Sequence, residues 1–143
     1  MKDQQLDGLV RQAIQKNGKT VVETLLKLLL LDCSHTDGLF QAACKLQAKY
    51  HGISPRELLS SRKADILLTR HLMIYTLYED HAWAVPTIKR LFRIERNSWI
   101  LSIIALTAGR LKMNYLNVPQ EYERISTSIE ALSQTFLNPQ TQL

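Results

Sequence analysis

The chain has 143 residues, of which 45% are apolar and 22% are charged, a balance typical of one globular domain rather than of a disordered segment. Its 5 Gly and 4 Pro form no glycine-rich phosphate-binding loop, which excludes the common nucleotide-binding motifs and disfavours a turn-rich β-sandwich. The net charge of +5 is concentrated in residues 61–115, which hold 9 of the 18 Lys and Arg but only 4 of the 13 Asp and Glu. Such an excess permits contact with nucleic acid.

Targeting and redox signals are weak in this sequence. The N-terminal residues MKDQQLDGLV are polar, and the most apolar run, residues 21–31, is interrupted by Glu23 and Lys27, so we expect neither a secretory signal nor a membrane span. The two cysteines, Cys33 and Cys44, are too few for a disulfide framework and are expected to be reduced thiols. These features predict a cytoplasmic protein, which would be nucleoid-associated if it binds DNA.

The N-terminal part of the chain is predicted to form two helices. Apolar residues recur at helical spacing in residues 3–15, and residues 20–31 are apolar on most faces. The second of these helices is therefore expected to be buried, either within the fold or against another chain. We divide the sequence into an N-terminal helical extension (residues 1–35, a candidate surface for a homodimer or a protein partner), a domain (residues 36–137) and a polar tail (residues 138–143).

The next elements follow from local start and stop signals. After a predicted connection at residues 32–35, a third helix is expected over residues 36–50. The sequence SPRE at residues 54–57 has the pattern of a helix start, with an N-cap serine, a proline at the first helical position and a glutamate as capping-box partner. A short helix and then a long helix over residues 63–79 should follow.

Residues 85–115 have the organisation of a helix–turn–helix. A short helix over residues 87–92 is followed by a connection at residues 93–96 and by a longer helix that Asn97 or Ser98 would cap. In such motifs the first residues of the second helix reach base edges in the major groove of DNA. A last helix over residues 120–136 completes an all-α protein with six to eight helices.

Residues 39–132 resemble the C-terminal DNA-binding domain of the bacterial replication initiator DnaA, a Trp-repressor-like helix–turn–helix domain. The segment LFQAACKLQAKYHGISPRELLSSRK is similar to that domain's opening helix, its short DLLS helix and the basic residues that follow. ADILLTRHLMIYTLYED is similar to the long helix that carries ARQ-x-AMYL, and WAVPTIKRLF is similar to SLPEIGRAF. RIERNSWIL stands where the signature GGRDHSTVL belongs. The resemblance rests on the order and spacing of these elements, and the chain is too short to include the initiator's ATPase module.

The resemblance implies a set of DNA contacts. Arg62, in the basic loop after the short helix, would enter the minor groove, whereas Arg96, Asn97 and Ser98 would enter the major groove. The side chains that would neutralise phosphates are Lys63, Arg70, Lys89, Arg90 and Arg93. For Arg70, a structural ion pair with a carboxylate of another helix competes with phosphate contact.

The sequence departs from the family at the helix–turn–helix itself. Arg93 and Ile94 replace the paired glycines of the signature, so the turn need not keep the family's backbone conformation. Glu95 stands where a basic residue is expected and opposes phosphate binding. Trp99 replaces a small hydroxyl residue, and we expect it, like Trp83, to pack in the core; for Trp99 the alternative is an exposed anchor for a partner.

Two functions therefore remain open. The first is a protein that binds duplex DNA without catalysis, in regulation or in replication. The second is a protein-interaction module that kept the fold but lost DNA binding, which Glu95, Leu106 and the apolar second helix favour. The four histidines show no metal-ligand spacing, and no nucleophile–base arrangement is visible, so we expect no enzyme activity, no cofactor and no metal site.

Overall fold

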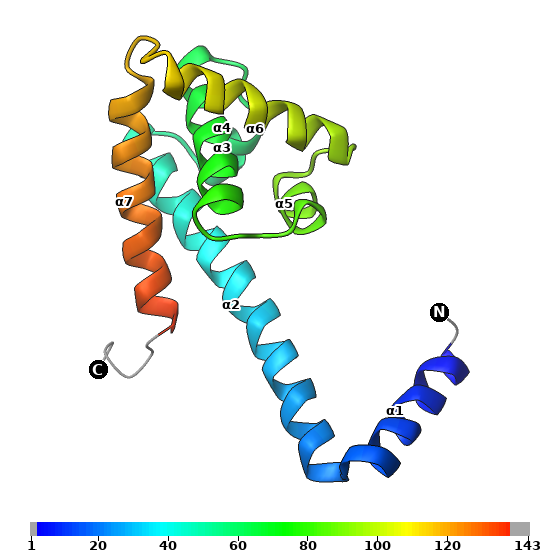
Figure 1. Cartoon of the computed structure of the whole chain (residues 1–143). Coiled ribbons are helices and arrows are strands. Elements are labelled where there is room, and N and C mark those ends of the chain that lie inside the picture. Colours follow the sequence, from blue (N-terminus) through cyan, green and yellow to red (C-terminus); the bar gives the residue numbers. More distant parts are fainter. Residues whose placement is uncertain (1–2, 138–143) are drawn as a thin grey trace. The chain divides into compact units, whose positions relative to one another are not determined.

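The structure is a computed structural model that describes residues 3–137, without the side chains of residues 23–35 and of a few residues near the two ends. Within this range it contains helices and no strand, which confirms the predicted all-α fold (Figure 1). The helices are α1 (Asp3–Asn17), α2 (Lys19–His51), α3 (Pro55–Ser60), α4 (Ala64–Glu79), α5 (Val85–Phe92), α6 (Asn97–Lys112) and α7 (Val118–Leu137). None of these helices combines the length and the apolar character that crossing a membrane requires.

The chain divides into two compact units, the first ending at Thr36 and the second beginning at Asp37. In the first unit, α1 is followed by Gly18, whose φ of +85° is accessible mainly to glycine. Among its described apolar side chains, Leu9 and Val21 are about half exposed and Val22 is buried. Most side chains of the apolar run lie outside the described residues, so the interface role of the extension stays a prediction.

Helix α2 is continuous where the sequence predicted a break. The expected connection at residues 32–35 is helical, and α2 runs from Lys19 to His51. The sequence DCSH at these positions contains neither proline nor glycine, and each of its residues costs a helix only about 0.5–0.7 kcal/mol relative to alanine. The strongly helix-forming leucines that precede them outweigh so small a cost, and the prediction of a break was wrong.

The start of α3 is as predicted. The backbone N–H of Glu57 donates to Ser54 Oγ at 3.2 Å, Ser54 has an extended backbone, and Pro55 occupies the first helical position. A serine cap of this kind stabilises a helix by about 1 kcal/mol. The cap fixes the start of α3, which is six residues long and ends at Ser60, directly before the basic loop.

Helix α4 is the central helix of the second unit. It packs against α6 and α7 and also contacts α3 and α5. Figure 1 shows α6 crossing α4 and α7 running beside it. The fully buried side chains of α4 are Thr69, Leu72, Met73, Ile74, Thr76 and Leu77. Because α4 contacts so many elements, its apolar residues occupy most of its surface rather than one narrow stripe.

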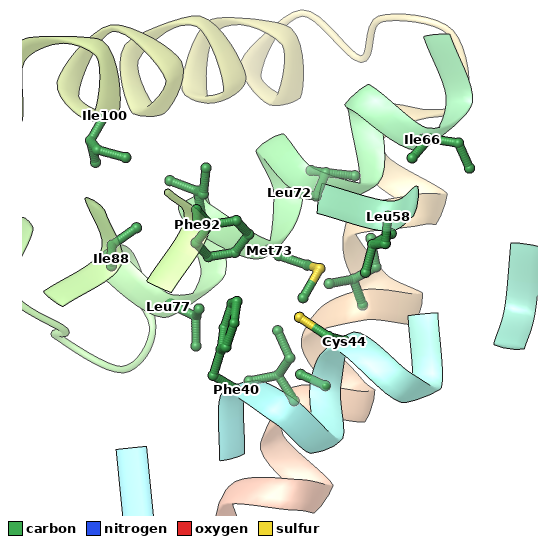
Figure 2. Packing of buried hydrophobic residues seen from close by; sticks show 14 of the residues in the cluster. Phe40, Cys44, Leu58, Ile66, Leu72, Met73, Leu77, Ile88, Phe92 and Ile100 are labelled. Atoms are coloured by element: carbon green, nitrogen blue, oxygen red, sulfur yellow. The ribbon is translucent and has the colours of Figure 1, made fainter. Parts of the chain in front are cut away.

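Aromatic and sulfur-containing side chains fill the centre of this core. Figure 2 shows Met73 and Cys44 pointing toward each other, with Phe40 beneath them. The rings of Phe40 and Phe92 meet edge to face, with centroids 5.0 Å apart. Cys44 is a free, buried thiol, and burial raises its pKa to about 12, so it stays protonated. Cys33 lies among the side chains that the structure does not describe.

A polar network joins α2 to α7. Gln47 is fully buried, and its Nε2 donates to Ser128 Oγ at 3.1 Å while its Oε1 accepts from Arg124 Nη1 at 2.7 Å. The Arg124 guanidinium lies 3.6 Å from the centroid of the Tyr50 ring and forms an ion pair with Glu121 at 2.7 Å. Both ends of the buried amide are thereby satisfied, which avoids the cost of an unpaired polar group.

Candidate nucleic-acid interface

The turn between α5 and α6 contains a left-handed arginine. Arg93 has φ 57° and ψ 44°, the conformation for which glycine is usually needed. The N–H of Ile94 donates to Lys89 O at 3.0 Å and that of Arg93 to Arg90 O at 3.3 Å, so the turn closes the end of α5. A left-handed backbone costs a residue with a Cβ about 1–2 kcal/mol. The turn is thus formed by a strained, exposed cation.

The N-cap of α6 lies one residue before the first of the two positions that the sequence predicted. The N-cap is Arg96, not Asn97 or Ser98, and no side chain makes a capping hydrogen bond there. Ile100 and Ile104 face the core, and this register places Asn97 and Ser98 in the first helical turn. Arg96, Asn97 and Ser98 are all exposed, as a DNA-reading tip requires.

Trp99 lies at the surface, contrary to the expectation that it packs in the core. Its side chain is 48% exposed, because the inward positions of this turn are taken by Ile100 and Ile104. The Arg96 guanidinium lies 5.8 Å from the centroid of the Trp99 ring. Trp83, in contrast, is partly buried and packs against the core as expected.

Two cavities share lining residues near the α5–α6 turn, and only the first is lined by residues of α6. The first, which we call the tryptophan cavity, has a volume of about 240 Å³, and Arg70, His71, Arg93 and Trp99 belong to its lining. The second, which we call the basic cavity, has a volume of about 710 Å³ and is lined in part by Lys45, Arg56 and Arg93. Leu59 and Arg93 line both. Neither lining includes a carboxylate, so both cavities attract anions.

Arg70 binds backbone carbonyls rather than a carboxylate. Its Nη1 donates to Leu58 O at 2.9 Å and to Ser61 O at 2.5 Å. Burial lowers the pKa of Arg70 from its usual range. The guanidinium thereby ties the end of α3 and the start of the basic loop to α4. The predicted ion pair and the predicted phosphate contact are thus replaced by hydrogen bonds to two backbone carbonyls. Arg70 acts here as a positioning residue for the loop.

The other cations predicted to contact DNA differ in their exposure and in whether a carboxylate is paired with them. Arg62 and Lys63 are exposed in the loop before α4, and within the described part of the chain neither has a carboxylate within 4.0 Å. Arg90 is paired with Asp37 at 3.0 Å, and Lys89 is only partly exposed. A phosphate would have to compete with Asp37 for Arg90, whereas Arg62 and Lys63 are available at once.

Lys45 and Arg56 were not singled out by the sequence. They lie on α2 and α3, outside the helix–turn–helix, and only the fold brings them to the cavity that Arg93 also lines. Apart from their charge, no sequence signal marks them. Glu95, which is expected from the sequence to oppose phosphate binding, is exposed in the same turn as Arg93 and Arg96.

A second surface feature is apolar. Leu101 and Leu106 of α6 are about half exposed. Met113 and Leu116, at the connection to α7, are each about three-quarters exposed. Together they form an exposed apolar surface on α6 and on the connection that follows it. Of the described His, Cys, Asp and Glu side chains, no three are close enough together to hold a metal ion.

These features define a class: an all-α protein with a helix–turn–helix whose tip is exposed and bordered by cations. Comparison with known proteins gives no match, whether against protein-family models, curated proteins or solved structures.

Proposed function

We propose that this protein binds duplex DNA through the α5–α6 helix–turn–helix, as does the C-terminal domain of the initiator DnaA that its sequence resembles. The supporting observation is the convergence of cations from four segments. Lys45, Arg56, Arg70 and Arg93 line two cavities that share Leu59 and Arg93, one of them also lined by Trp99 of α6, and no carboxylate belongs to either lining. Phosphate binding depends on such a grouping of positive charge.

The exposed tip supplies the groups that contact bases. Arg96, Asn97 and Ser98 would enter the major groove, where arginine pairs with guanine and asparagine with adenine. Arg62 would enter the minor groove from the loop that Arg70 holds in place.

Phosphates would be neutralised by the cations around this tip. Lys63, Lys89 and Arg93 serve directly, Arg70 positions the loop, and Arg90 contributes once its pair with Asp37 opens. The protein would act by occupying a DNA site, in regulation or in replication and without a catalytic step, at the nucleoid in the cytoplasm.

Salt dependence tests this proposal. Binding of random duplexes is measured by mobility shift or fluorescence anisotropy at ~50 and ~200 mM salt. Neutralising about five phosphates predicts that affinity falls by roughly several hundredfold over this range. The Arg62→Ala variant should bind more weakly with unchanged thermal stability, and Lys112→Ala, at the far end of α6, is the matched control. No binding at any salt, even at high protein concentration, refutes the proposal.

The exposed apolar surface favours a second candidate function, a protein-interaction module that kept the fold and lost DNA binding. Leu101, Leu106, Met113 and Leu116 are the residues that would contact the partner. A Leu106→Glu substitution should then abolish association, measured by analytical ultracentrifugation, and leave the thermal melt unchanged. Salt-dependent DNA binding that survives Leu106→Glu would argue against this alternative.

A further inference from the structure

The exposed tip of α6 offers paired bases few hydrogen bonds beyond those of Arg96, Asn97 and Ser98. Trp99 has a single donor and no acceptor, and the neighbouring exposed positions carry Ala105 and Leu106. Reading base edges in a major groove depends on side chains that can form hydrogen bonds with those edges. A tryptophan side chain stacks on the face of a base, and in a fully paired duplex that face is covered by the neighbouring bases.

The tryptophan cavity has the size for one ring system. Its volume of about 240 Å³ is below the ~300–1,000 Å³ of pockets that hold drug-sized ligands. Leu59, Phe92 and Ile94 contribute apolar wall next to Trp99. A flat aromatic group of limited size, such as a nucleobase, fits this lining better than an extended peptide or a branched ligand does.

One residue of the lining carries a buried polar atom that lacks a partner. His71 belongs to its lining, and Nδ1 of this ring is buried without a hydrogen-bond partner. Burial and the nearby charges of Arg110 and Arg70 lower the pKa of His71, so the ring is neutral at pH 7. The edge of an entering base carries donors and acceptors that would pair with it.

Two exposed cations lie close to this cavity. Arg93 lines the cavity, and the Arg96 guanidinium is 5.8 Å from the Trp99 ring centroid. Arg70 joins the cavity to the loop that carries Arg62, through its bond to Ser61 O. An aromatic platform bordered by cations is the arrangement that holds single-stranded nucleic acid.

We propose that Trp99 and the tryptophan cavity hold one unpaired DNA base, so that the protein prefers DNA with an unpaired stretch next to a duplex over fully paired DNA. This inference rests on the proposed DNA-binding function and names its substrate more narrowly. A base that is already unpaired enters without the unstacking that a paired base requires, which gives the preference its direction.

The test uses the full chain and two DNA probes, a fully paired duplex and the same duplex with a single-stranded tail. In a Trp83→Phe background Trp99 is the only tryptophan, and the tailed probe should quench its fluorescence. The tailed probe should bind about 5- to 150-fold more tightly than the duplex, the range expected for one stacked base. Trp99→Ala should abolish this preference and Trp99→Phe should keep part of it.

Leu101→Ala is the matched control, since Leu101 lies on the same helix and is as exposed as Trp99. It should leave the preference unchanged, and thermal melts of all variants separate loss of binding from loss of fold. Equal affinity for the two probes, or binding without quenching, overturns this inference and leaves the proposed function standing. Absence of binding to either probe at any salt overturns both.

Discussion

If the protein binds DNA as proposed, a single substitution at Arg93 should change stability and DNA binding in opposite directions. It adopts φ 57° without being glycine, and it is an exposed cation at the turn of the helix–turn–helix. Arg93→Gly removes both the left-handed strain and the charge. Most substitutions that remove a binding residue also weaken the fold, which makes this position unusually informative.

The expected gain in stability follows from two opposing terms. Relief of the left-handed strain raises the free energy of unfolding by about 1–2 kcal/mol. The greater freedom of glycine in the unfolded chain lowers it by about 0.4–1 kcal/mol. We expect Arg93→Gly to raise the free energy of unfolding by about 0.5–1 kcal/mol and the Tm by roughly 2–4 °C. Urea unfolding and thermal melts followed by circular dichroism measure both quantities.

DNA affinity should fall in the same variant. Loss of one phosphate contact lowers the slope of log K against log salt by about 0.9. Arg93→Ala is the control for strain, because it removes the charge but keeps a Cβ in the left-handed conformation, so it should lose affinity without gaining stability. A lower Tm for Arg93→Gly would refute the strain argument, and an unchanged salt slope would refute the phosphate contact.

Two further predictions concern neighbouring groups. Arg70→Gln loses hydrogen bonds from a charged group to two carbonyls, so we expect it to lower the free energy of unfolding by about 1.5–3 kcal/mol in urea, whereas Arg62→Ala should stay within ~0.5 kcal/mol of the wild type. Equal losses in both variants would contradict the positioning role of Arg70. His71 has a pKa lowered by burial, Arg110 and Arg70, so the unfolded chain binds its proton more readily. Stability should therefore decline as the pH falls below ~6.5, and melts between pH 8 and 5 should show a flatter decline for His71→Gln; identical profiles would show that His71 does not contribute.

Local signals in the sequence were sufficient for features that depend on neighbouring residues. The cap of α3 by Ser54 was predicted from four consecutive letters, and the structure has that cap. The same approach failed at residues 32–35, where polar residues suggested a break and α2 continues. Polar side chains in a helix are tolerated wherever no proline or glycine interrupts the hydrogen bonds, so polarity alone is a weak helix stop.

The sequence by itself determined the all-α fold, the order of the helices and the excess of positive charge in residues 61–115, because helix formation and net charge depend on composition and short-range spacing. Only the tertiary structure decided which residues meet. Arg70 bonds Leu58 O and Ser61 O, and Trp99 is outside the core because Ile100 and Ile104 take the inward positions. Lys45, Arg56 and Arg93 are far apart along the chain and close together in space. Such encounters depend on how helices pack, and packing is a property of surfaces that no local segment contains.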